Sequence, residues 1–223
     1  MGIIEIAKII EYNASKVIEN ITSEMIEPYI YIQTEYKKSD VSANKTFQNI
    51  FCKYYQINID EAGQEYINNY FQCLEKYKNP DKIDVEQICV ALSYTKDSNG
   101  KYQPINYKNV SCFLNLLNNQ FTVWHEEFLK MFGIPQPYFL DTGKEIRYFQ
   151  LSLIKIYKEF DEIMRLNLLP TALRLFDEKY PDAGISIEKK LEFLFLAFDR
   201  INFLDVLFPE EDKILDEDSI SLN

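Results

Sequence analysis

Residues 186–203 of this chain of 223 residues read SIEKKLEFLFLAFDRINF, and this stretch decides the fold. Ser186 is a residue type that caps helix N-termini, and it stands directly before the apolar residues. Wound as a helix, the stretch is apolar on nearly every side: Ile187, Leu191, Phe193, Leu194, Phe195, Leu196, Ala197, Phe198, Ile201 and Phe203. A helix with so little polar surface has to be buried by other elements, so the stretch predicts a helix that runs through the core.

The rest of the chain shows the same helical periodicity. Residues 146–164 repeat apolar side chains at spacings of three and four over about six turns. Residues 168–180 form a shorter segment with Pro170 near its start, where proline suits a helix. Further apolar stripes cover residues 3–21, 23–37, 42–55, 60–74, 84–92, 110–117 and 121–132. The sequence therefore predicts an all-α protein of roughly eight to ten helices, arranged in one compact or two-lobed bundle.

Several residues suggest where these helices begin. Ser42 and Asp60 are suited to cap the segments that follow them. Asp84, with Gln87 three residues later, reads as a capping box. Pro28 suits a first turn or a kink better than a helix middle. The clearest turn is residues 96–101, which either joins two short strands (90–95 and 102–105) or, as the cap at Asp84 favours, follows a helix.

The chain divides into one helical domain over residues 1–207 and an acidic C-terminal tail over residues 208–223. The tail holds six carboxylates against Lys213, and we expect it to be flexible. Within the helical domain, Gly133-Ile134-Pro135-Gln136-Pro137 interrupts the periodicity. This interruption predicts a lobe boundary near residues 133–143.

The charge balance argues against a dedicated nucleic-acid binder. The chain carries 24 Lys and Arg residues against 35 Asp and Glu residues, a formal net charge of −11. Affinity for nucleic acid comes mainly from cationic side chains that displace counterions, so an acidic chain repels the phosphate backbone. Only four of the bases are arginines, the side chain best suited to phosphate and guanine. A local basic groove stays open as an alternative.

The sequence also limits where the protein is expected in the cell and which cofactors it could bind. The N-terminal residues Glu5, Lys8 and Glu11 interrupt the apolar run, which predicts neither a signal peptide nor a membrane span. We therefore expect a soluble cytoplasmic protein without membrane contact. The four cysteines lie far apart among apolar residues, which predicts four reduced, buried thiols rather than a zinc site. No phosphate loop, dinucleotide fingerprint, esterase elbow or zincin motif occurs, so we expect no cofactor and no metal.

The densest polar cluster holds the only tryptophan and the only histidine of the chain, Trp124-His125-Glu126-Glu127. One interpretation is a general base with an orienting carboxylate, or two metal ligands. On a helix, however, the neighbours of His125 would be Gln120, Phe121, Phe128 and Leu129, none of which ionises. The structural interpretation is an indole that packs into the core while the two glutamates stabilise a helix N-terminus. The sequence favours this structural interpretation.

Between Phe47 and Ala197 the order of segments resembles a known group. The segments are Phe51–Ile57, Ala62-Gly63 with Tyr70-Phe71, Ser111–Asn118, Val123–His125, Phe132–Ile134, Phe176–Pro181 and Lys189–Leu194. They resemble a group of uncharacterised bacterial all-helical proteins that is distantly similar to the helix-hairpin-helix superfamily of DNA base-excision glycosylases. The resemblance covers about two thirds of the chain. It implies a helical fold.

Two departures from that superfamily bear on function. The glycosylases carry a Pro-x-Asp type motif whose aspartate supports glycosidic bond cleavage, and His125 stands at the matching place. An imidazole does not replace a carboxylate in stabilising a cationic sugar transition state. The glycine-rich hairpin that grips a phosphate is also missing, with Lys108 the only base just upstream. The resemblance thus implies that the ancestral chemistry was lost.

These observations lead to competing hypotheses. The leading one is a non-catalytic helical binding protein that acts through a macromolecular partner, most simply a basic protein, as in a phage–host conflict. The alternative is a nucleic-acid-processing enzyme with a degenerate glycosylase-like fold and a cleft lined by Trp124, His125, Glu126 and Lys108. A third is a small-molecule site between two lobes. The sequence itself leaves the partner and the oligomeric state open.

Overall fold

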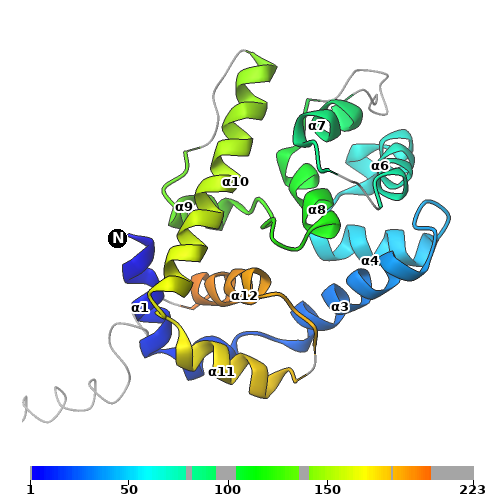
Figure 1. The fold of residues 1–223 in the computed structure, drawn as a ribbon. Coiled ribbons are helices and arrows are strands. Elements are labelled where there is room, and N and C mark those ends of the chain that lie inside the picture. The colour runs from blue at the N-terminus through cyan, green and yellow to red at the C-terminus, as the bar shows by residue number, and fades with distance from the viewer. Residues whose placement is uncertain (1, 79–81, 94–103, 136–140, 182, 202–223) are drawn as a thin grey trace, which may run out of the picture.

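The computed structural model describes residues 2–78, 82–93, 104–135, 141–181 and 183–201, and every regular element within these ranges is a helix (Figure 1). The predicted all-α fold is therefore confirmed. The helices are α1 (Ile3–Tyr12), α2 (Ala14–Glu19), α3 (Ser23–Lys38), α4 (Lys45–Tyr55), α5 (Ile59–Ala62), α6 (Gln64–Lys76), α7 (Val85–Ser93), α8 (Tyr107–Leu117), α9 (Glu126–Met131), α10 (Thr142–Arg165), α11 (Pro170–Lys179) and α12 (Ile187–Asp199).

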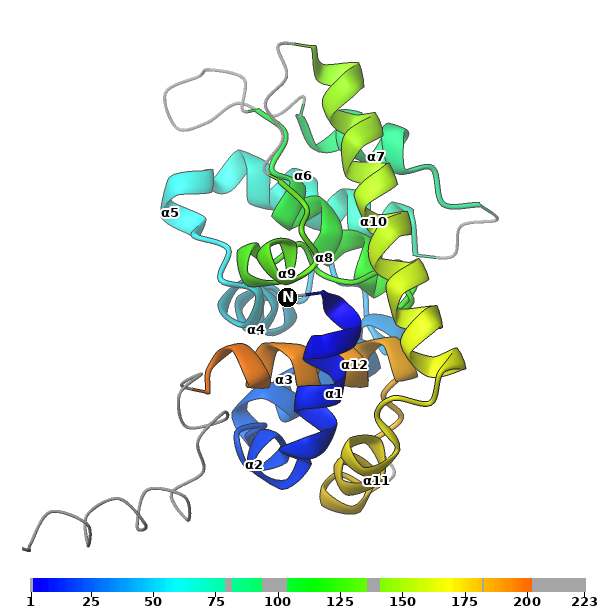
Figure 2. The same cartoon turned by 90° about the vertical axis from the view of Figure 1, so that its left-hand side faces the viewer.

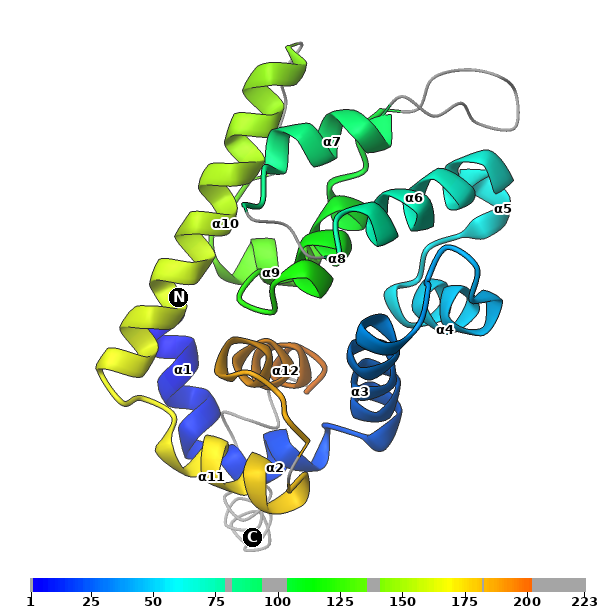
Figure 3. The same cartoon turned by 45° about the vertical axis from the view of Figure 1, so that its right-hand side comes forward.

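Helix α12 lies in the interior, as its apolar sequence predicts. It packs against α1, α2, α9, α10 and α11, and these helices surround it in Figure 3. Leu191, Leu194, Phe195 and Ala197 have no exposed surface. Ser186 caps the helix, since its Oγ accepts a hydrogen bond from the Lys189 amide at 3.3 Å. Two charged residues of α12, Lys189 and Glu192, are buried together with the apolar ones.

The N-terminal helices pack beside the C-terminal ones. Helices α1 and α2 contact α11 and α12, and Figure 2 shows α1 and α2 close to α11 and α12. The Glu11 carboxylate accepts hydrogen bonds from the amides of Thr171 and Ala172 at the start of α11. In return, Lys179 Nζ donates to the carbonyl oxygens of Ile18 and Ile21, both at 2.7 Å. Segments about 160 residues apart are thus tied by polar contacts at helix ends.

The remaining helices form the other part of the core. Helix α3 packs on α4 (Figure 3). Each helix from α5 to α8 contacts the next one along the chain, and α7 also contacts α10. Aromatic rings fill the space between α4, α6 and α8: Phe47, Phe51, Tyr70, Phe71 and Phe113. These edge and tilted ring contacts explain why aromatic residues recur at helical spacing in this sequence.

The described residues contain twelve helices rather than the expected eight to ten. The stretch 3–21 is broken at Asn13, whose φ of −105° and ψ of 26° leave helical geometry. The stretch 60–74 is broken at Gly63, which has a φ of 83°. The caps at Ser42 and Asp60 are also wrong, because Asn44 caps α4 and Asn58 caps α5. Both asparagines stand only two residues from the predicted caps.

Other predictions from the sequence have mixed outcomes. The cap at Asp84 is confirmed, since its Oδ1 accepts from the Gln87 amide at 3.0 Å, and the helix continues to Ser93. The cysteines are free, and Cys52, Cys89 and Cys112 are buried, but Cys73 is only half-buried, so the prediction of a buried thiol is wrong there. Within the described ranges, no helix is long and apolar enough to cross a bilayer. The turn 96–101, the tail 208–223 and residues 136–140 of the predicted lobe boundary lie outside the described residues.

Candidate functional site

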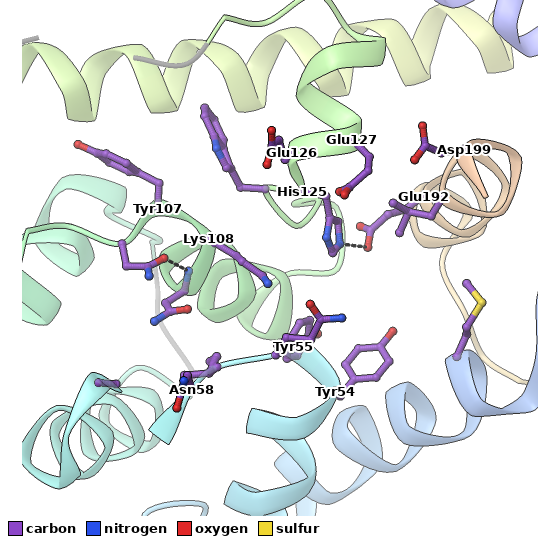
Figure 4. Close-up of a pocket in the computed structure, with 18 of the residues that line it drawn as sticks. Tyr54, Tyr55, Asn58, Tyr107, Lys108, His125, Glu126, Glu127, Glu192 and Asp199 are labelled. Carbon is purple, nitrogen blue, oxygen red and sulfur yellow. Dashed lines mark hydrogen bonds and ion pairs between the residues drawn. The ribbon is translucent and has the colours of Figure 1, made fainter. Parts of the chain in front are cut away.

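A cavity of about 1070 Å³ opens between α4 and α5 on one side and α9 and α12 on the other, with the start of α8 between them. All four residues singled out from the sequence line it: Lys108, Trp124, His125 and Glu126. Figure 4 shows His125 and Lys108 approaching the same space from different segments. We call this cavity the cleft. Its volume is at the upper end of the range of small-molecule sites.

The segment before α9 is held in place from two sides. The Trp124 amide donates to Ser111 Oγ on α8 at 2.7 Å, and the Val123 amide donates to Glu192 Oε2 on α12 at 3.2 Å. His125 follows with extended backbone, φ −92° and ψ 141°, and serves as the residue before the first turn of α9. The segment therefore presents the imidazole to the cleft instead of winding it into a helix.

Trp124 packs as the structural interpretation of the sequence predicts. Its indole is 7% exposed, and its ring centroid lies 4.9 Å from Phe149 and 6.4 Å from Tyr107. Tyr107 in turn stacks at 5.0 Å on Phe149 and donates from its hydroxyl to Glu145 at 3.3 Å. The indole is thus a largely buried, apolar part of the wall of the cleft.

His125 has a neighbour that the sequence did not reveal. Its Nε2 lies 3.7 Å from Oε1 of Glu192, and the His125 side chain is 25% exposed while that of Glu192 is 1% exposed. The expectation that no ionisable group faces His125 is therefore wrong. It assumed that His125 sits inside a helix, where its neighbours would be three or four residues away. The imidazole instead meets a buried carboxylate from α12 at the wall of the cleft (Figure 4).

Glu192 is held in its charged form by its surroundings. Its Oε1 also accepts from Lys189 Nζ, and Lys189 is 2% exposed. That ammonium lies 4.8 Å from the ring centroid of Tyr29 and 5.1 Å from that of Phe193. Burial opposes the charge of Glu192, but the charge of Lys189 and the nearby imidazole together lower the pKa of this carboxyl below its ordinary value. The carboxylate is therefore a buried, charged neighbour of His125 at neutral pH.

The mouth of the cleft is acidic. Glu126 and Glu127 begin α9, and Glu126 pairs with Lys130 at 3.1 Å on the surface. Burial and the charge of Glu127 raise the pKa of Asp199. Three cationic residues line the cleft (Lys108, Lys189 and Arg200) against five carboxylates (Glu61, Glu126, Glu127, Glu192 and Asp199). The cleft thus carries two net negative charges with the imidazole neutral.

The opposite wall comes from α4 and the residues after it, none of which the sequence analysis selected. Tyr54 and Tyr55 line the cleft, and the Tyr55 hydroxyl donates to Asn115 Oδ1 at 3.2 Å. Burial raises the pKa of both tyrosines well above the ordinary value. They therefore act as neutral aromatic surfaces and hydrogen-bond donors. For Lys189 and Glu192 a signal did exist in the sequence, because charged residues interrupt a helix that is otherwise apolar all round.

No family model, curated protein or solved structure matches this chain. The site therefore has to be interpreted from its own chemistry. Among the residues that the structure describes, no group of three or more His, Cys, Asp and Glu side chains is placed to hold a metal ion. The resemblance to helix-hairpin-helix glycosylases stays a prediction.

Proposed function

We propose that this protein is an enzyme that binds a small ligand with a planar ring in the cleft, and that His125 transfers a proton to or from that ligand. A nucleoside, which combines a flat ring with an uncharged sugar, is the simplest ligand of this class. The observation that carries the proposal is the 3.7 Å approach of His125 Nε2 to Oε1 of the buried Glu192 at the cleft wall.

The chemistry of the pair supports proton transfer. Histidine changes its charge near neutral pH, which is what a general acid or base needs. The carboxylate of Glu192 lies on the Nε2 side of the ring, so we expect the imidazole to reach a ligand through Nδ1. Lys108, also on the wall, places a positive charge where a leaving or attacking group would become negative.

The walls and the charge favour a small ligand over a polyanion. Tyr54, Tyr107 and Trp124 bring aromatic surface to the wall of the cleft, against which a ring can pack. The two net negative charges of the cleft disfavour a nucleic-acid strand, whose phosphates bind through cationic side chains. The proposal therefore keeps the enzymatic alternative drawn from the sequence but replaces a strand by a single small molecule.

The solitary histidine makes the test direct. Because the chain has one histidine, its Hε1 proton gives one imidazole resonance in the NMR spectrum. We expect this resonance to shift and saturate with at least one of adenosine, inosine, cytidine and uridine, and chromatography to detect turnover. The variant His125→Gln should bind the nucleoside but react roughly 10² to 10⁴ times more slowly. If none of the four nucleosides shifts the resonance or is turned over, the proposal is wrong.

A second candidate function, the protein-binding role favoured by the sequence, is supported by a different surface. The outer face of α10 exposes Leu151, Ile154, Tyr157 and Met164, of which Leu151 is 56% exposed. Exposed apolar residues on one helix face are typical of a docking surface. On this hypothesis, Leu151→Lys should abolish co-purification of a stoichiometric partner, while His125→Gln should leave it intact.

A further inference from the structure

Three helices end in the same backbone motif. After α4, α9 and α10 the chain takes one residue with positive φ, and the next amide bonds back to the carbonyl five residues earlier. These bonds are Ile57 to Cys52 at 2.8 Å, Ile134 to Leu129 at 2.8 Å and Leu168 to Ile163 at 3.1 Å. Such a helix end requires a left-handed residue at the turn, a position that glycine fills most easily and asparagine next.

The residues at these three turns differ. Gly133, with φ of 57°, follows α9, and Asn167, with φ of 49°, follows α10, which are the residue types that the conformation favours. Gln56, with φ of 55°, follows α4 and has no such advantage. Of the three, only Gln56 lines the cleft. A glutamine at a position that favours glycine suggests that its side chain has a use there.

The amide of Gln56 is not used within the fold. Four amide side chains line the cleft. Asn58 and Asn106 accept hydrogen bonds that cap α5 and α8, and Asn109 donates to the Tyr66 hydroxyl at 3.1 Å. Gln56 is exposed, and within the described part of the chain its side chain makes no hydrogen bond. It is therefore the amide of the cleft whose oxygen and nitrogen are both left for a ligand.

We infer that Gln56 is the specificity-determining residue of the cleft and recognises a donor–acceptor edge of the bound ring, such as a lactam or a carboxamide. The inference rests on the proposed function, which supplies the ligand. A primary amide donates through its nitrogen and accepts through its oxygen, so it pairs with a group that offers both in one plane.

The test uses two matched variants at positive-φ positions. Gln56→Gly should raise the Tm by roughly 2–4 °C, because the left-handed turn is relieved, and should weaken inosine binding about tenfold. Asn167→Gly, at the same motif but outside the cleft, should leave inosine binding unchanged. Binding is measured for both from the His125 Hε1 resonance. A merely structural residue would not give opposite effects on stability and affinity.

A chemically modified ligand provides the second part of the test. In 1-methylinosine the N–H donor of the lactam edge is replaced by a methyl group, so the wild type should bind it about tenfold more weakly than inosine. Gln56→Gly should bind both nucleosides with equal affinity. Equal inosine binding by wild type and Gln56→Gly, or a lower Tm in that variant, overturns the inference while the proposed function stands. If inosine does not shift the wild-type resonance at millimolar concentration, the inference falls, and the proposed function is then judged on the other three nucleosides.

Discussion

Lys189 and Glu192 place two opposite charges inside a helix whose other buried residues are apolar. A buried ion pair rarely stabilises a fold more than apolar residues of the same size, because both charges lose their hydration. The pair is therefore better explained by what it does than by stability. It fixes the segment before α9 through the Val123 amide and gives His125 a charged neighbour.

The buried pair of Lys189 and Glu192 predicts that removing one charge destabilises the fold more than removing both. Lys189→Met removes the partner of a buried carboxylate and should lower the free energy of unfolding by about 3–5 kcal/mol. The double variant Lys189→Met/Glu192→Gln removes both charges and keeps an oxygen for the Val123 amide, so it should lose much less. Urea denaturation measures both. Lys130→Met, which breaks the exposed pair with Glu126, is the control and should change stability by less than about 0.5 kcal/mol.

The low pKa of Glu192 predicts how its contribution depends on pH. Its folded pKa lies below the ordinary value of 4.5, so the charged form stabilises the fold above about pH 4.5, and this stabilisation is lost as the pH falls through the folded pKa. The charged and titratable groups that interact with it include Lys189, His125, Tyr29, Tyr54, Tyr55 and Cys112. The stability difference between wild type and Glu192→Gln should therefore be largest at neutral pH and shrink towards pH 3. A difference that stays constant between pH 7 and pH 3 contradicts this assignment.

At the scale of elements, α11 depends on a residue of α1. Glu11 accepts hydrogen bonds from the Thr171 and Ala172 amides at 2.9 and 3.1 Å, while Pro170 has no amide hydrogen to satisfy. A carboxylate at a helix N-terminus accepts hydrogen bonds from the free amides, and its negative charge interacts favourably with the positive end of the helix dipole.

We therefore expect Glu11→Ala to lower the free energy of unfolding by about 1–2 kcal/mol, measured by urea denaturation. The control is Glu19→Ala, which removes an exposed carboxylate from α2 and should have an effect within about 0.5 kcal/mol. Equal effects of the two substitutions would show that the cap contributes nothing.

The elements also show what the sequence can and cannot predict. The core position of α12 and the caps at Asp84 and Ser186 follow from local patterns, and both caps are found. The breaks at Asn13 and Gly63 could not be predicted from local patterns, because a polar residue or a glycine within an apolar stripe is compatible with either a break or a continuous helix. The pairing of His125 with Glu192 joins residues far apart in the chain, which no periodicity reports. Trp124 and Glu126 were selected because they belong to the densest polar cluster, and Lys108 because of the resemblance to the glycosylases; all three line the cleft.

At the scale of the whole molecule, the net charge of −11 and the acidic cleft predict no affinity for duplex DNA. A short duplex should give no electrophoretic shift at physiological salt. Replacing both mouth glutamates, Glu126→Lys and Glu127→Lys, reverses the charge of the cleft and should produce weak, salt-sensitive binding. A shifted band with the wild type would favour the strand-processing enzyme over the small-ligand enzyme proposed above.

The central place of α12 also constrains how the chain folds during synthesis. Helices α1 and α2 leave the ribosome before α11 and α12, against which they pack and which are translated more than 150 residues later. At typical rates of protein synthesis this delay lasts on the order of ten seconds. During that time the side chains of Ile6, Ile10 and Val17, which are buried in the folded protein, lack the helices that cover them. We therefore expect the packing of α1 and α2 to be completed only after α11 and α12 have been synthesised.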